Sequence, residues 1–201
     1  MLELLADAME VPIDRRSALL GRFQHLQRLS LIDGINPGRG TAAEYKANHV
    51  LVIAVAFQML QLGMTPERAV HVLKQNQERV RMAIGLAVGK KALVSPSMVW
   101  FDPAVLTRSG ATGSSDEIDL ADATFHYGGS GTGREMFKHS LIDGFAQRLA
   151  FISFSGTLWH IISAIDGQTP TARKPAIGPR AAIFLSSLRE WFEQSTPDSF
   201  A

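Results

Sequence analysis

The stretch Leu31–Tyr45 reads LIDGINPGRGTAAEY and organises the first half of the chain. It holds two clusters of turn-forming residues, Asp33-Gly34 and Asn36–Gly40. Two short strands joined at a Gly-Arg-Gly tip would form a small hairpin. Arg39 on this tip would reach DNA phosphates or enter a narrow minor groove, where the negative potential is strongest. We therefore predict a wing that carries Arg39, with an ordinary surface loop as the alternative.

The segment before this loop is predicted to be a helix with two different faces. Asp14 is expected to cap it. An apolar stripe recurs at helical spacing and would face the core; it consists of Leu19, Leu20, Phe23, Leu26 and Leu29. A second row stands nearly opposite and consists of Ser17, Gly21, Gln24 and Arg28. A helix that enters the major groove needs such an outward row of hydrogen-bonding side chains, although a solvated helix face is the alternative.

The segment after the loop is predicted to be a long buried helix that begins near Thr41 and continues through Leu62. Every residue from Val50 to Phe57 is apolar, so this helix has no polar face to offer water. Gly63 should end it. Thr65 and Pro66 are then typical of the cap and the first position of a further helix.

These segments together resemble MerR-type winged-helix transcription regulators. The resemblance rests on the wing-like NPGRG at residues 36–40, on AEYK at residues 43–46, on the apolar helix, and on LGMTPERAV at residues 62–70. It covers roughly residues 1–82 and implies a dimeric DNA-binding protein with a helix-turn-helix and a wing in each subunit. The chain has no cysteine-rich tail like that of the metal-sensing members, so the resemblance carries generic DNA binding and not metal sensing.

The expected DNA contacts follow from the polar row and the wing. We expect residues on or beside the helix to face the major groove or its walls, Arg39 to act from the wing, and Lys46 to act beside it; the helix residues are Arg15, Arg16, Ser17, Gln24 and Arg28. The expected partners are double-stranded DNA, a second copy of the chain, and RNA polymerase. A small-molecule effector is left undetermined.

The second half changes in character after Gly85, with more glycine, proline and serine. The sequence predicts short strands at Ser97–Phe101 and Ala121–Tyr127, a glycine-rich turn at Gly128–Gly133, an amphipathic helix at 136–149, and a terminal helix at Ala181–Glu193. Phe151–Ile165 fits either a strand followed by a helix or one buried helix. We therefore predict a mainly α fold with minor β structure: a winged helix-turn-helix domain at residues 1–83, and an α+β or helical dimerisation or effector domain at residues 84–201.

Composition limits the other function classes. A formal net charge of +1 on 201 residues restricts any nucleic-acid affinity to a local patch. The 0 cysteines exclude disulfides and thiol nucleophiles, and the six histidines lack metal-site or hydrolase spacing. We therefore expect no enzyme, no cofactor, no metal, no membrane span and a cytoplasmic location. The alternatives are a protein-interaction scaffold that reuses the winged-helix fold and, further away, an enzyme whose glycine run binds a nucleotide.

Overall fold

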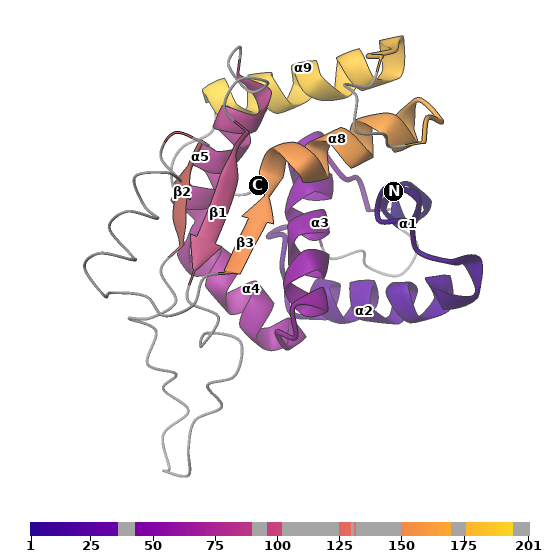
Figure 1. Ribbon diagram of the computed structural model, residues 1–201. Coiled ribbons are helices and arrows are strands. Elements are labelled where there is room, and N and C mark those ends of the chain that lie inside the picture. Colours follow the sequence, from indigo (N-terminus) through magenta and orange to yellow (C-terminus); the bar gives the residue numbers. More distant parts are fainter. Residues whose placement is uncertain are drawn as a thin grey trace.

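The structure is a computed structural model, and it describes residues 1–35, 43–89, 96–101, 125–129, 131, 150–169 and 176–194. Helices dominate these residues, and one small sheet accompanies them (Figure 1). The predicted fold class, mainly α with minor β structure, is confirmed at this level.

The chain begins with two helices joined by a short connection. Helix α1 (Leu2–Ala8) is followed by the 3-10 turn η1 (Ile13–Arg15) and helix α2 (Arg16–Arg28). Asp14 lies inside η1, and among the described residues no side chain caps the start of α2. The prediction that Asp14 caps this helix is therefore wrong, because the 3-10 turn already carries the chain into the helix.

Helix α3 (Ala47–Gln61) runs through the middle of the molecule, and its residues from Asn48 to Phe57 are all buried. The predicted all-round burial is confirmed, although the helix begins later than expected, at Ala47. Gly63 follows the end of α3 with a positive φ of 98°, a backbone conformation that glycine adopts without strain.

Helix α4 (Pro66–Gln75) begins as the sequence predicts, because the Thr65 hydroxyl accepts a hydrogen bond from the Arg68 amide at 3.4 Å. Helix α5 (Gln77–Val88) follows after Asn76, a buried residue between the two helices. The side-chain amide nitrogen of Asn76 donates to the Val72 carbonyl at 2.8 Å, and its side-chain oxygen accepts from the Phe125 backbone N–H at 2.9 Å. Asn76 thus joins the α4–α5 corner to the chain that enters the sheet.

The sheet has the strand order β2-β1-β3 and is antiparallel throughout. Its strands are β1 (Met98–Phe101), β2 (His126–Gly128) and β3 (Ala150–Ser153). Val99 in the central strand pairs with Tyr127 on one side and with Ile152 on the other. The strand predicted at Ser97–Phe101 is confirmed within one residue.

Strand β3 passes directly into helix α8 (Phe154–Ile165). The Ser153 hydroxyl makes this junction, because it accepts a hydrogen bond from the Gly156 amide at 2.9 Å and so caps the helix. Of the two alternatives for this segment, the strand followed by a helix is the correct one.

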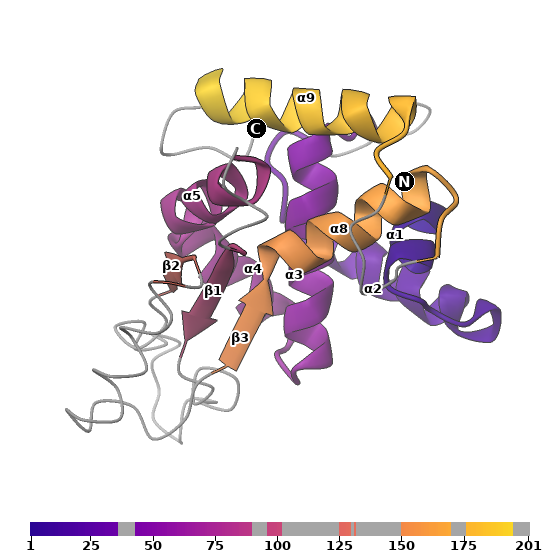
Figure 2. The same cartoon turned by 45° about the horizontal axis from the view of Figure 1, so that its top comes forward.

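Helix α9 (Pro179–Gln194) packs on α3, α5 and α8, as Figure 2 shows. The Asp166 carboxylate at the end of α8 accepts a hydrogen bond from the Gly178 amide at 2.6 Å, just before α9 begins. At the other end of α9, the Arg189 guanidinium donates to the Val88 carbonyl at 3.1 Å. The predicted terminal helix is therefore confirmed, and it packs within its own chain.

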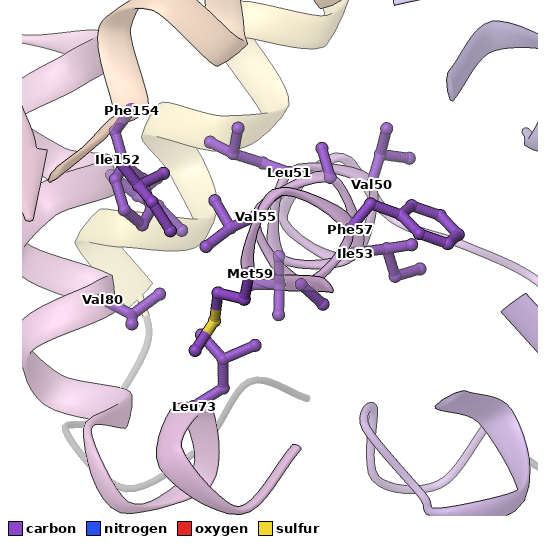
Figure 3. Close-up of a cluster of buried hydrophobic side chains, with 14 of the residues drawn as sticks. Val50, Leu51, Ile53, Val55, Phe57, Met59, Leu73, Val80, Ile152 and Phe154 are labelled. Carbon is purple, nitrogen blue, oxygen red and sulfur yellow. The ribbon is translucent and has the colours of Figure 1, made fainter. Parts of the chain in front are cut away.

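The buried side chains form one cluster around α3. In Figure 3, Met59 of α3 lies beside Leu73 of α4, and Val55 faces Ile152 and Phe154 of the β3–α8 segment. The same cluster includes residues from α1 and α2 and from α9. Within the described ranges, the core is thus continuous across the domain boundary expected near residue 83, which falls inside α5.

Candidate nucleic-acid interface

The outward face of α2 carries the polar row that the sequence predicts. Its four members, Ser17, Gly21, Gln24 and Arg28, are all exposed. Leu19, Phe23 and Leu26 are buried on the opposite side. Leu20 departs from the predicted inward stripe, because it lies at the edge of the buried face and is 42% exposed.

Helix α2 as a whole contains three arginines and no acidic residue, and Arg28 is the one that belongs to the outward row. Arg15, Arg22 and Arg28 are exposed. Arg22 was not among the predicted contacts, because it lies off the spacing of the outward row and occupies the flank of the helix. The basic character of the sequence segment is the signal that would have identified it.

Arg16, one of the expected DNA contacts, forms ion pairs within the chain. Its guanidinium forms ion pairs with two carboxylates of α1, those of Glu3 and Asp7, the latter at 2.6 Å. Hydrogen bonds to Asp7, and then to Glu3, raise the pKa of the Arg16 guanidinium above its ordinary value. These ion pairs hold α1 against α2, and a contact of Arg16 with the groove would have to compete with them.

The flanks of α2 are attached to α4. The His25 imidazole lies 3.0 Å from the Glu67 carboxylate, which is in the first turn of α4. Just beyond α2, the Asp33 carboxylate accepts a hydrogen bond from the Lys74 ammonium at 2.8 Å. These contacts fix α2 by its sides and leave its outward row facing solvent.

The chain that returns towards α3 is also fixed against α2. Gln27 of α2 donates a hydrogen bond to the Tyr45 hydroxyl, and the Phe23 and Tyr45 rings have centroids 5.8 Å apart. Burial raises the pKa of the Tyr45 phenol, and the hydrogen bond from Gln27 acts in the opposite direction. Lys46 follows directly and is exposed, and its backbone N–H donates to the His49 imidazole at 3.2 Å.

The predicted wing cannot be compared with the structure at its tip, since Arg39 lies in residues 36–42, outside the described residues. Its two described flanks, residues 31–35 and 43–46, form bends, turns and irregular chain and are not strands. The predicted pair of short strands is therefore not found in these flanks, because their backbone hydrogen bonds are not those of a ladder.

Gly21 lies in the middle of the outward row and in open space. A methyl group built on it would have no described atom within 4 Å, so packing does not require glycine at this position. Glycine in a helix interior is unfavourable by about 0.5–1 kcal/mol relative to alanine. The described packing therefore gives no reason for glycine at this position, where the helix backbone is exposed.

Comparison of this chain with protein-family models, with characterised proteins and with solved structures finds no match. In the part of the chain that the structure describes, no three histidine or carboxylate side chains come together in a way that would hold a metal ion. The described helices also lack the length and continuous apolar character needed to cross a membrane. Of the glycine-rich run at residues 128–133, the structure describes Gly128, Gly129 and Gly131.

Proposed function

We propose that this protein is a sequence-specific DNA-binding transcription regulator that acts as a homodimer, with a winged helix-turn-helix arrangement similar to that of MerR-type regulators. Helix α2 would lie in the major groove, and the segment that carries Arg39 would act as the wing. The observation that carries the proposal is the outward face of α2, an exposed row of polar side chains on a helix with three arginines and no acidic residue. Arginine, glutamine and serine are side chains that read base edges or bind phosphates.

Each member of the interface has a distinct role in this proposal. Gln24, Arg28 and Ser17 would contact base edges or the walls of the groove. Arg15, Lys46 and Arg39 would bind phosphates, and Gly21 would allow the helix backbone to approach the sugar-phosphate wall. Arg16 is a positioning residue, because its ion pairs with Glu3 and Asp7 orient α2 relative to α1.

The proposal predicts salt-sensitive binding despite the small net charge of the whole protein. Each phosphate that a basic side chain neutralises releases counterions, and the slope of log K against log salt changes by about 0.9 per contact. A local patch of a few arginines therefore gives a measurable slope, although the formal net charge is only +1.

Selection of binding sites from random duplex DNA by the full-length protein tests the proposal. Recovery of a two-fold symmetric site would support both DNA binding and a dimer. Arg28→Ala should weaken binding by about 1–3 kcal/mol, and Arg39→Ala should reduce the salt slope by about one contact.

The matched control is Arg180→Ala, because Arg180 is an exposed arginine on α9, which lies across the molecule from α2 in both views (Figures 1 and 2). Its removal should leave the affinity unchanged. Unchanged affinity for both Arg28→Ala and Arg39→Ala would remove the groove assignment.

A second candidate function is supported by two apolar side chains beside α2. Ile13 in η1 is 86% exposed, and Leu20 is 42% exposed. These side chains suit a protein-interaction scaffold in which the same end of the molecule contacts another protein. This candidate predicts no salt-sensitive binding to any duplex, and Ile13→Ser would weaken partner binding while leaving duplex binding unchanged.

A further inference from the structure

A cavity of about 410 Å³ lies where α1, α3 and the β3–α8 segment meet. Ligand pockets in proteins typically measure roughly 300–1,000 Å³ and combine apolar walls with a few convergent polar groups. The walls here are mostly apolar, from residues such as Ala54, Leu62, Phe151 and Ile161. The polar lining includes Glu10, Gln58 and His160.

A chain of hydrogen bonds fixes the orientation of the Gln58 amide. Its nitrogen donates to the Thr157 hydroxyl at 2.6 Å, and that hydroxyl donates to the Ser153 carbonyl at 2.7 Å. The reverse orientation of the amide would place its oxygen against a hydroxyl whose hydrogen is already used. Among the described contacts, Gln58 therefore keeps its carbonyl oxygen, an acceptor, and the second hydrogen of its amide nitrogen for another molecule.

The contact of the His160 imidazole with α1 fixes which of its two ring nitrogens carries the hydrogen. Its Nδ1 atom lies 3.2 Å from the Ala8 carbonyl oxygen, which can only accept. Nδ1 must therefore carry the hydrogen, and in the neutral ring Nε2 is an acceptor. This contact also joins α8 to the last residue of α1, across 152 positions of sequence.

Glu10 adds a carboxylate to the lining and adopts an uncommon backbone conformation, with φ at 52°. It follows α1 at the position that usually holds glycine in this type of helix end, where the Val11 amide donates to the Ala6 carbonyl at 2.8 Å. Ser30 occupies the equivalent position after α2, with φ at 55°, and is not part of the cavity lining. The two residues share a backbone strain and differ in their relation to the cavity.

We propose that this cavity is a binding site for a small organic molecule with an apolar body and a hydrogen-bond-donating head group, an amine or a hydroxyl. The apolar walls receive the body. The head group donates to the acceptors that the fold leaves to it: the Gln58 carbonyl oxygen, His160 Nε2 and the Glu10 carboxylate. A negatively charged head group would instead lie against the Glu10 carboxylate and be repelled by it.

Three probes with the same ring system test this chemistry on the full-length protein. Tryptamine and tryptophol carry a donating amine and a donating hydroxyl on one indole body, and indole-3-acetate carries a carboxylate on the same body. Two-dimensional amide NMR spectra should show tryptamine and tryptophol shifting the Gly156 and Thr157 resonances, with Leu188 of α9 as an unaffected reference. Indole-3-acetate should bind at least about tenfold more weakly, because Glu10 repels its carboxylate and because the carboxylate cannot donate to the acceptors of the lining.

Two sets of variants then test the residues. His160→Phe keeps an aromatic ring but removes Nε2 and also the Nδ1 contact with Ala8, and it should weaken tryptophol binding by about tenfold. Glu10→Gly and Ser30→Gly form a matched pair, because both relieve a positive-φ strain and only the first removes a lining group. Glu10→Gly should weaken tryptamine binding, whereas Ser30→Gly should leave it unchanged.

The pair keeps the test decisive even if His160→Phe unfolds the protein, because both glycine variants are expected to fold at least as well as the parent. Equal binding of all three probes, or no shift of Gly156 and Thr157 by tryptamine at millimolar concentration, would overturn the proposal. So would equal loss of tryptamine binding in the Glu10→Gly and Ser30→Gly variants.

Discussion

Helices α2 and α9 are both amphipathic, both lie on the surface, and each buries three residues in the same core. Their charges differ. Helix α9 contains two arginines and two glutamates, and Arg189 donates its hydrogen bond to a backbone carbonyl of α5. Helix α2 has three arginines and no acid, and among the described residues Arg16 alone of the three forms ion pairs with a neighbouring helix. The apolar stripe of an amphipathic helix therefore predicts which face packs on the core. The balance of charges on the helix indicates whether its polar side chains are neutralised within the chain or left for another molecule.

A glycine in a helix interior shows the same contrast. A methyl group on Gly85 of α5 would lie 2.3 Å from the Phe192 ring of α9, so alanine at this position would force the ring to move. The Arg81 guanidinium lies 4.9 Å from the centroid of the same ring. Gly21 of α2 has no described neighbour within 4 Å of such a methyl group. One glycine serves the fold, and the other has no structural reason among the described contacts.

Removal of α9 should destabilise the protein more than any single substitution in α2. A chain that ends at residue 178 loses the buried Ala181, Leu185 and Leu188 and uncovers parts of α3, α5 and α8. Each buried leucine contributes about 1.5–3 kcal/mol, against a typical total stability of about 5–15 kcal/mol. We expect no cooperative urea transition by circular dichroism. In contrast, Arg28→Ala on α2 should change the free energy of unfolding by less than about 0.5 kcal/mol.

Gly85→Ala should destabilise the protein by about 1–3 kcal/mol, because the added methyl group overlaps the Phe192 ring. Urea unfolding measures the change. A double-mutant cycle provides the control, since Gly85→Ala should cost much less in a Phe192→Ala background. An equal cost in both backgrounds would show that the ring is not the cause.

Gly21→Ala should have the opposite effect on stability and should separate folding from function. The methyl group has room, and alanine favours the helix by about 0.5–1 kcal/mol, so the midpoint of unfolding should rise. DNA affinity in a shift assay should fall, because the methyl group holds the helix away from the sugar-phosphate wall. Undiminished affinity in this more stable variant would remove the proposed close approach of the backbone.

The smallest expected effect concerns pH and His126 in β2. Burial, and then the charge of Arg79, lower the pKa of the His126 imidazole, and the ring stacks on Trp100 with centroids 5.9 Å apart. The unfolded chain therefore binds a proton at a higher pH than the folded one. The stability from this histidine is complete above its ordinary pKa of 6.5 and is lost as the pH falls towards the lowered value.

Urea midpoints at pH 7.5 and pH 5.0 measure this effect. The decrease between them should be smaller in His126→Gln than in the parent protein. An identical decrease in the two proteins would assign the acid sensitivity to other groups.

The sequence predicts those features that depend on local patterns. The apolar run of α3, the Thr65-Pro66 start of α4 and the stripe of α9 each correspond to a helix, because periodicity and capping act within a few residues. The outward row of α2 is exposed for the same reason. The role of Arg16 was not predictable, because it depends on α1 folding back so that Glu3 and Asp7 face α2. The cavity is even less predictable from local sequence patterns, because His160 contacts Ala8 only through the packing of α8 on α1.

The backbone conformation at the ends of the helices affects how many destabilising substitutions the protein tolerates. Helices α3 and α8 end at glycines with positive φ, Gly63 and Gly167, whereas α1 and α2 end at Glu10 and Ser30 with the same backbone sign. A left-handed residue other than glycine costs about 1–2 kcal/mol. Glu10→Gly and Ser30→Gly would recover much of this energy, an amount comparable to what a typical destabilising mutation removes. Glycine at these two helix ends would thus offset one or two destabilising substitutions elsewhere in the protein without loss of the fold.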